Sequence, residues 1–220
     1  MKAATQQSAA TKTRHRILRA AETIFAEKGF RAMTLRDVTR EARVNLAAVN
    51  YHFGSKINLM RAVIERRFEP INRLRLQQLE DAIVAQGTEP LPLEQIFDAL
   101  FRPLFDQVET AKGPDRILIQ MIGRALTEPA DFIRDMHREF FYELSQRFLY
   151  ELRRTCPELP ENELQLRYFL SVSTMLGTIT EQVRLENMTD GKLGSGDLDQ
   201  ICDALIRYVV AGFRQTPTEA

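Results

Sequence analysis

The sequence predicts an all-helical protein, and three observations carry this prediction. Apolar residues recur every three to four positions over nearly the whole chain, which is the period of an amphipathic helix. No segment alternates apolar and polar residues between hairpin turn signals, as a half-buried strand would. The ten glycines and nine prolines fall mostly between the periodic segments, where they mark helix ends. These breaks divide the chain into about nine predicted helices.

The first predicted helix runs over residues 12–28, and its apolar face includes Ile17 and Phe25. Gly29 follows and supplies the left-handed residue that commonly ends a helix. Residues 1–11 lack an apolar period, so we expect them to form a disordered basic arm.

Two short helices are predicted next, over residues 35–42 and 46–53. Thr34 and Asn45 immediately precede them, and both residue types cap helix N-termini with their side chains. Two short helices joined by about three residues, after a longer supporting helix, are typical of a helix-turn-helix. The second helix of such a unit enters the major groove of DNA.

The remaining predicted helices form a larger body with wide apolar stripes. Pro70 lies inside the first of them and is expected to kink it. These helices span residues 56–86, 91–110, 114–127, 130–155, 161–184 and 197–213.

Composition excludes several classes of protein. Hydrophobic residues make up 44% and charged residues 27% of the chain, which excludes collagen-like, low-complexity and wholly disordered proteins. Cys156 and Cys202 lack the spacing of a disulfide framework and fit a reducing compartment. The longest stretch without a charged residue, 168–180, is shorter than the roughly 20 residues of a membrane helix. The N-terminus has no apolar signal region, so we expect a cytoplasmic protein with no membrane partner.

Charge is unevenly distributed along the chain, although the net charge is zero. Residues 1–56 hold eleven Lys or Arg against four Asp or Glu, a balance of +7, and residues 57–220 carry −7. A basic N-terminal quarter on an acidic body favours a polyanion-binding head, because phosphate contacts need Lys, Arg and exposed donors. A chance imbalance on solvated faces is the alternative.

A set of residues in the basic quarter matches a known family pattern. The matching positions are Ile17, Leu18, Ala20, Ala21, Phe25, Glu27, Gly29, Phe30, Thr34, Val38, Ala42, Val44, His52, Phe53, Ser55, Lys56 and Leu59. At these positions the chain resembles the TetR family of transcriptional regulators. The resemblance implies a DNA-binding domain over residues 12–55, followed by a helical domain over 56–215 that binds a small effector and dimerises through its last two helices. The run 44–56 is similar to a subgroup that includes fatty-acid-responsive regulators.

The resemblance also assigns DNA contacts to individual positions. Its base-reading residues fall on Arg36, Leu46, Ala47 and Asn50. Its phosphate-contacting residues fall on Thr34, Tyr51, His52 and Lys56. We add Arg43 and the helix cap Asn45 as phosphate contacts.

Two positions depart from the family pattern. Many members have glycine where this chain has Arg43, and tyrosine where it has Asn50. At a left-handed position a non-glycine residue costs ~1 kcal/mol, which Arg43 can offset by reaching a DNA phosphate. The operator sequence therefore cannot be transferred from a relative.

Long and soft apolar side chains in the body are candidates to line an effector pocket, because Phe and Met adapt to apolar ligands. Core packing is the alternative explanation. The predicted pocket residues are Phe97, Phe101, Phe105, Met121, Phe141 and Met175. For an acyl effector, the polar head could meet Arg102, Arg124 or His137.

The last two predicted helices carry apolar stripes wider than a monomer can bury, which favours a twofold four-helix interface. The predicted interface residues are Leu170, Leu176, Ile179, Val183, Leu205 and Val209.

Catalytic and metal-binding motifs are missing from the sequence. The three histidines are scattered, and there is no H-E-x-x-H, G-x-S-x-G or phosphate-cradling glycine loop. We therefore expect no enzymatic activity, no cofactor and no metal site. The sequence predicts a homodimeric regulator, most often a repressor, that binds a pseudo-palindromic double-stranded DNA operator. It also predicts that the regulator responds to a small hydrophobic effector, for which an acyl compound is the more specific candidate. The alternative is a helical ligand-binding or adaptor protein whose basic head contacts a protein partner.

Overall fold

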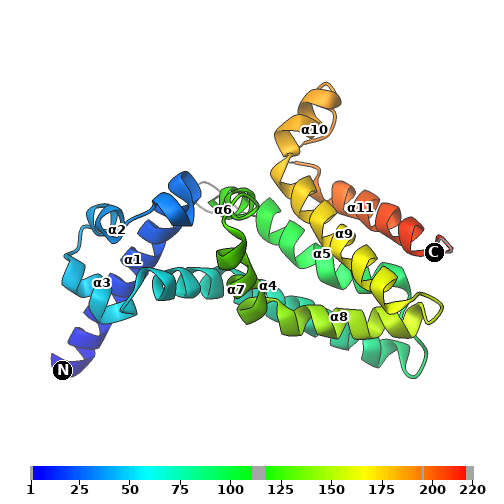
Figure 1. Ribbon diagram of the computed structural model, residues 1–220, viewed down its shortest axis with the longest axis horizontal. Helices are drawn as coiled ribbons and strands as arrows, with labels where there is room; N and C mark the ends of the chain where they lie inside the picture. Colours follow the sequence, from blue (N-terminus) through cyan, green and yellow to red (C-terminus); the bar gives the residue numbers. More distant parts are fainter. Residues whose placement is uncertain (1, 111–116, 195, 217–220) are drawn as a thin grey trace. The chain divides into compact units, whose positions relative to one another are not determined.

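The computed structural model describes residues 2–110, 117–194 and 196–216. These ranges hold eleven helices and no strand (Figure 1), so the predicted all-helical class is confirmed. Two compact units form, one from residues 1–69 and 117–140 and the other from 70–116 and 141–220.

The first unit contains the predicted helix-turn-helix. Its helices are α1 (Lys2–Ala32), α2 (Leu35–Ala42), α3 (Leu46–Phe53), the first half of α4 (Lys56–Gln86), α6 (Ile117–Ala125) and α7 (Ala130–Phe140). Apolar side chains from all six helices form one core, which includes Ile17, Val49 and Phe132. The predicted boundary after residue 55 therefore differs from the structure, in which the first unit also takes up the start of α4 and a later segment of the chain.

The N-terminal helix is longer than predicted. It begins at Lys2, so the expected disordered arm over residues 1–11 is corrected to helix from Lys2 on. Four of the residues from Lys2 to Thr11 are alanines, the best helix formers, and no glycine or proline precedes Gly29 to stop the helix. Gly29 itself has φ 77° and ψ 170°, which confirms the predicted break.

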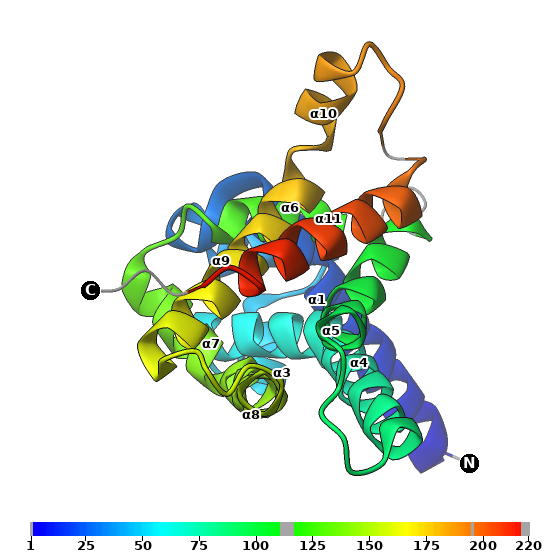
Figure 2. The same ribbon diagram turned by 90° about the vertical axis from the view of Figure 1, so that its right-hand side faces the viewer.

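The second unit is a bundle of helices around a phenylalanine-rich core. Its helices are the second half of α4, α5 (Leu93–Glu109), α8 (Tyr142–Thr155), α9 (Glu161–Thr180), α10 (Gln182–Met188) and α11 (Leu198–Phe213). Helix α11 packs along α5, and α8 contacts both α5 and α9 (Figure 2). The rings of Phe97, Phe101 and Phe213 pack together in this core, with centroids 5.4 and 5.0 Å from that of Phe97.

Two predicted helices are each divided in the structure, which raises the count from about nine to eleven. The backbone leaves helical geometry at Phe141 (φ −127°, ψ −13°) and at Glu181 (φ −100°, ψ 22°). Neither break contains glycine or proline, so the punctuation used to place helix ends did not mark them.

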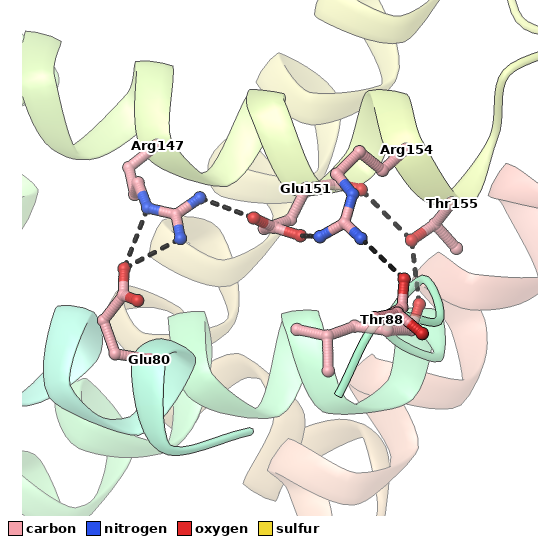
Figure 3. A network of polar contacts seen from close by, with 7 residues as sticks. Glu80, Thr88, Arg147, Glu151, Arg154 and Thr155 are labelled. Carbon is pink, nitrogen blue, oxygen red and sulfur yellow. Dashed lines mark hydrogen bonds and ion pairs between the residues drawn. The ribbon is translucent and has the colours of Figure 1, made fainter. Parts of the chain in front are cut away.

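A buried ion network joins α8 to the end of α4 and the loop after it (Figure 3). The carboxylate of Glu151 is 1% exposed and accepts from Arg147 at 2.6 Å and from Arg154 at 2.9 Å. Arg147 also pairs with Glu80 of α4, and Arg154 donates to the Thr88 carbonyl at 3.1 Å. The buried carboxylate of Glu151 is therefore paired, which is the condition for tolerating a charge away from water.

Candidate nucleic-acid interface

Helix α2 begins with a capping box, as the position of Thr34 predicts. The Thr34 hydroxyl accepts from the Asp37 N–H at 3.1 Å, and the Asp37 carboxylate accepts from the Thr34 N–H at 3.1 Å. Asp37 also pairs with Lys28 at 3.0 Å and Arg40 at 2.9 Å. The hydrogen bonds from Thr34 and Lys28 lower the pKa of the Asp37 carboxyl well below its ordinary value. Two of the first orphan donors of the helix are thus satisfied.

The turn between α2 and α3 has the left-handed residue that the sequence indicates. Arg43 has φ 52° and ψ 51°, a conformation that glycine adopts without strain and other residues adopt at a cost. The N–H of Val44 donates to the Thr39 carbonyl at 3.0 Å, which closes the C-terminus of α2 in the manner of a Schellman turn.

Arg16 of α1 fixes the same turn, a role that the sequence did not indicate. Its guanidinium donates to the Ala42 carbonyl at 2.8 Å and to the Arg43 carbonyl at 2.8 Å. These contacts satisfy carbonyls that a helix end leaves without partners. A side chain of the supporting helix α1 therefore fixes the backbone of the turn between α2 and α3.

Helix α3 has one buried and one exposed face. Asn45 caps it by accepting from the Ala48 N–H at 2.8 Å, as predicted. Val49 and Phe53 are buried in the core of the first unit. The opposite face exposes the predicted base-reading residues Leu46, Ala47 and Asn50 together with Tyr51, whose side chain is 83% exposed.

Two arginines beside this face are free to meet an anion. Arg36 on α2 and Arg43 in the turn are exposed. In the part of the chain that the structure describes, neither guanidinium lies within 4 Å of a carboxylate. Cations left unpaired on an exposed surface keep their full attraction for a polyanion.

Two predicted phosphate contacts are partly used inside the fold. The Lys56 ammonium donates to the Met33 carbonyl at 2.9 Å and lies 4.4 Å from the centroid of the Phe30 ring. Burial lowers the pKa of Lys56. His52 is half-buried, with its ring 5.1 Å from that of Tyr51.

The six predicted pocket residues are divided between the two units. Met121 belongs to the core of the first unit, whereas the other five lie in the second unit. Phe97, Phe101, Phe105 and Met175 are at most 2% exposed, and Phe141 is half-buried at the break before α8. A surface groove of about 560 Å³ in the second unit has none of the six in its lining, which comes from α4, α5 and α11.

The three candidate partners for a polar head are also placed. Arg102 lines that groove but is already paired with Asp98, Asp199 and Asp203. Arg124 donates to the Glu27 carbonyl of α1 at 2.8 Å in the first unit. His137 is exposed on α7 of the first unit.

The predicted dimer residues divide into two groups. Ile179, Leu205 and Val209 are at most 7% exposed within the single chain, because they face its own core, so their prediction as contact surface is corrected. Leu170 and Val183 are 52% and 71% exposed, and Leu176 is half-buried. The prediction missed two further exposed apolar residues on the same part of the chain, Phe169 on α9 and Tyr208 on α11. Their period along the helix could have shown them.

Within the ranges described, no group of three or more His, Cys, Asp or Glu side chains could hold a metal ion. None of the described helices has an apolar stretch that would cross a bilayer.

Comparison with known proteins agrees with this geometry. A family model described as bacterial regulatory proteins of the tetR family matches residues 17–63. A second, described as the tetracyclin repressor-like C-terminal domain, matches residues 98–212. The probable HTH-type transcriptional regulator YttP of Bacillus subtilis is 24% identical over 140 residues, which cover 64% of this chain and 62% of YttP. The chain thus matches less than two thirds of the length of that relative.

Two solved structures share the fold. The fatty acid degradation regulator FadR from Bacillus halodurans has a TM-score of 0.60 at 18% identity, over 93% of this chain and 97% of that one. SmeT in complex with triclosan has a TM-score of 0.61 at 18% identity, over 91% and 90%. Because the C-terminal family model covers more than half of the residues and the N-terminal model covers the helix-turn-helix, the chain belongs to the TetR family of bacterial transcriptional regulators.

Proposed function

We propose that the protein is a homodimeric transcriptional regulator that binds a pseudo-palindromic operator through α3 and responds to a small hydrophobic effector. The observation that carries this proposal is the exposed face of α3, where Leu46, Ala47 and Asn50 are open to solvent beside a turn held by Arg16. A helix with one face packed on its own domain and the other face exposed to solvent is suited to the major groove.

The exposed side chains have the chemistry of base readout. The Asn50 amide can pair with N6 and N7 of adenine, and the Arg36 guanidinium can pair with O6 and N7 of guanine. Leu46 and Ala47 can lie against a thymine methyl group. Each good polar pair discriminates against a wrong base by ~1–3 kcal/mol.

Phosphate contacts would hold the register without reading sequence. Arg43 and the Tyr51 hydroxyl are exposed on the flanks of α3, and the N-terminus of α3 itself favours an anion. Thr34, Asn45, His52 and Lys56 already make contacts within the fold, so we assign them a smaller share of the phosphate binding.

Dimerisation would use the exposed apolar side chains of α9 and α11. Phe169, Leu170 and Tyr208 are 63%, 52% and 71% exposed, and covering them with a second copy removes apolar area from water. Two copies related by a twofold axis place two recognition helices one DNA turn apart, about 34–36 Å. This spacing is the reason to expect a pseudo-palindromic operator.

Effector control would operate as a population shift, in which the effector binds one arrangement of the heads better than the other. A coupling of ~1–3 kcal/mol is typical and changes operator affinity about 5- to 150-fold. Of the two proteins that share the fold, FadR is a fatty acid degradation regulator and SmeT was solved in complex with triclosan. Both descriptions support an apolar effector, and the repressor role follows the usual mode of the family.

The test is to titrate the full chain onto labelled DNA from upstream of its own gene at several salt concentrations. The proposal expects a steep fall of log affinity with log salt and a protected, pseudo-palindromic footprint. An adaptor with a basic head for a protein partner would give neither. Absence of a footprint at low salt would refute the proposal.

A further inference from the structure

A buried arginine in the second unit has no anionic partner. Arg75 of α4 is 4% exposed. Its guanidinium donates to the Leu100 carbonyl at 2.7 Å, to Asn72 Oδ1 at 3.2 Å and to the Met175 sulfur at 3.7 Å. Five N–H donors therefore meet three neutral acceptors, and one of these is a weakly accepting thioether.

The charge on Arg75 is unusual for its surroundings. No carboxylate of the described residues lies within 4 Å of its guanidinium. Tyr168, which interacts with it electrostatically, is a phenol whose pKa burial raises further, so it is neutral at pH 7. Burial lowers the pKa of Arg75 to about 10, which leaves it charged at neutral pH. Arginine is rarely fully buried without a partner, and removing an unpaired charge from water is costly.

Glu151, in the same unit, is a buried charge that does have charged partners. That carboxylate is equally buried but lies between two arginines. The second unit thus pairs a buried charge where the charge serves packing, and leaves Arg75 with neutral neighbours only.

The surface groove reaches the neighbourhood of Arg75. Gln78, one helical turn further along α4, and Ala99, next to Leu100 on α5, both line it. Positions three apart on a helix share a face. The Gln78 Oε1 atom is buried and has no hydrogen-bond partner in the described ranges. The Met175 side chain lies against the guanidinium, and Leu79, one helical turn further along α4, is fully buried.

We infer that Arg75 is the binding site for the carboxylate of an apolar effector, which would take the place of the Met175 sulfur at the guanidinium. A carboxylate can accept two parallel N–H bonds from the guanidinium. The methionine side chain is flexible enough to move aside, and the apolar tail would lie among the buried side chains of α4, α5 and α9. This inference rests on the proposed function, since it names the chemical class of the effector.

A purely structural role for Arg75 makes a different prediction. Pro103 lacks the N–H that would bond to the Ala99 carbonyl, and its ring crowds the preceding turn of α5. In a purely structural role, Arg75 would do no more than donate to the neighbouring Leu100 carbonyl in this disturbed turn. In that case, the affinity for a carboxylate would not depend on the charge at this position.

The experiment titrates the full chain with a series of saturated fatty acids from octanoate to tetradecanoate, and with the neutral alcohols of the same lengths, by calorimetry. The variants are Arg75→Met, which keeps the volume without charge, and Arg75→Lys, which keeps the charge. Arg153→Met is the matched control, because Arg153 is an exposed, paired arginine of the same unit and does not line the groove. Circular dichroism and operator binding check that each variant folds.

The inference expects at least one fatty acid to bind, and Arg75→Met to weaken that binding about 10- to 100-fold. The affinity for the matching alcohol should change less than about threefold. Arg75→Lys should recover part of the lost affinity, and Arg153→Met should bind like the wild type. A folded Arg75→Met variant with wild-type fatty-acid affinity would overturn it. So would failure of the whole series to bind the wild type.

The two proposals fail separately. Operator binding is measured without effector, so a wild type that binds no operator would refute the proposed regulator function. The fatty-acid titration would still test the role of Arg75 in that case. Operator binding without any fatty-acid binding would refute only the role of Arg75.

Discussion

The turn residue Arg43 allows a prediction in which stability and DNA binding move in opposite directions. Its left-handed backbone, with φ 52°, costs a non-glycine residue roughly 1–2 kcal/mol. Arg43→Gly removes this strain but adds freedom to the unfolded chain, worth about 0.4–1 kcal/mol. We expect the unfolding free energy to rise by about 0.5–1 kcal/mol, and the melting temperature by about 2–4 °C per kcal/mol in a protein of this size.

DNA binding should weaken at the same time, because the exposed guanidinium of Arg43 is lost. The log–log salt slope should fall by about 0.9 for each phosphate contact removed. Both quantities are accessible, one by denaturant titration and the other by fluorescence anisotropy on labelled operator DNA.

Arg43→Ala is the matched control, since it removes the same charge and keeps a Cβ in the left-handed position. It should weaken DNA binding as much as Arg43→Gly without a gain in stability. If the alanine and glycine variants are equally stable, the argument from backbone strain is wrong. If neither variant changes the salt slope, Arg43 does not contact phosphate.

Arg16→Ala should lower the unfolding free energy by about 1–2 kcal/mol, because it removes the side chain that caps the end of α2. Arg19 is exposed on the same helix, and Arg19→Ala should leave the unfolding free energy unchanged. Equal losses in the two variants would contradict the capping role of Arg16. Glu151→Ala should cost about 3 kcal/mol in the same denaturant titration, because it leaves two arginines beside a buried site, and a loss below about 1 kcal/mol would show that the network is dispensable. Phe169→Asp should shift the sedimentation coefficient from dimer to monomer, and an unchanged dimer would place the interface elsewhere. The pKa of Asp37 is lowered in the folded protein, so the ionised carboxylate stabilises the fold above the ordinary carboxyl pKa, and this stabilisation is lost as the pH falls. The difference in unfolding free energy between the wild type and Asp37→Asn should therefore shrink on acidification. A difference that does not depend on pH would exclude this linkage.

The local features of the DNA-binding head could be predicted from the sequence because short-range chemistry determines them. Thr34 and Asn45 cap the helices that follow them, and both roles depend on side chains that reach only three residues along the chain. Gly29 and Arg43 occupy left-handed positions that the end of a helix requires.

Features set by packing between distant segments could not be predicted in this way. The breaks at Phe141 and Glu181 carry no local signal. The local sequence does not distinguish Arg75 from the other arginines in the polar stretch of α4. Two of its three acceptors lie 25 and 100 positions away, so only the packing of α5 and α9 against α4 shows that it is buried.

The proposed dimer surface shows the same limit in a milder form. Both faces of α9 and α11 carry apolar residues, so the stripe alone did not tell which face the chain itself covers. The structure assigns Ile179 and Val209 to the protomer core and leaves Phe169 and Tyr208 exposed.

The most direct test of the claim that α3 reads DNA sequence is selection of bound oligonucleotides from a random pool with the wild type and with Asn50→Ala. The wild type should enrich two half-sites related by twofold symmetry and about one helical turn apart. Asn50→Ala should lose its preference at one base pair in each half-site and keep the others. Enrichment of the same sites with unchanged preference in the variant, or no enrichment by the wild type, would contradict the account.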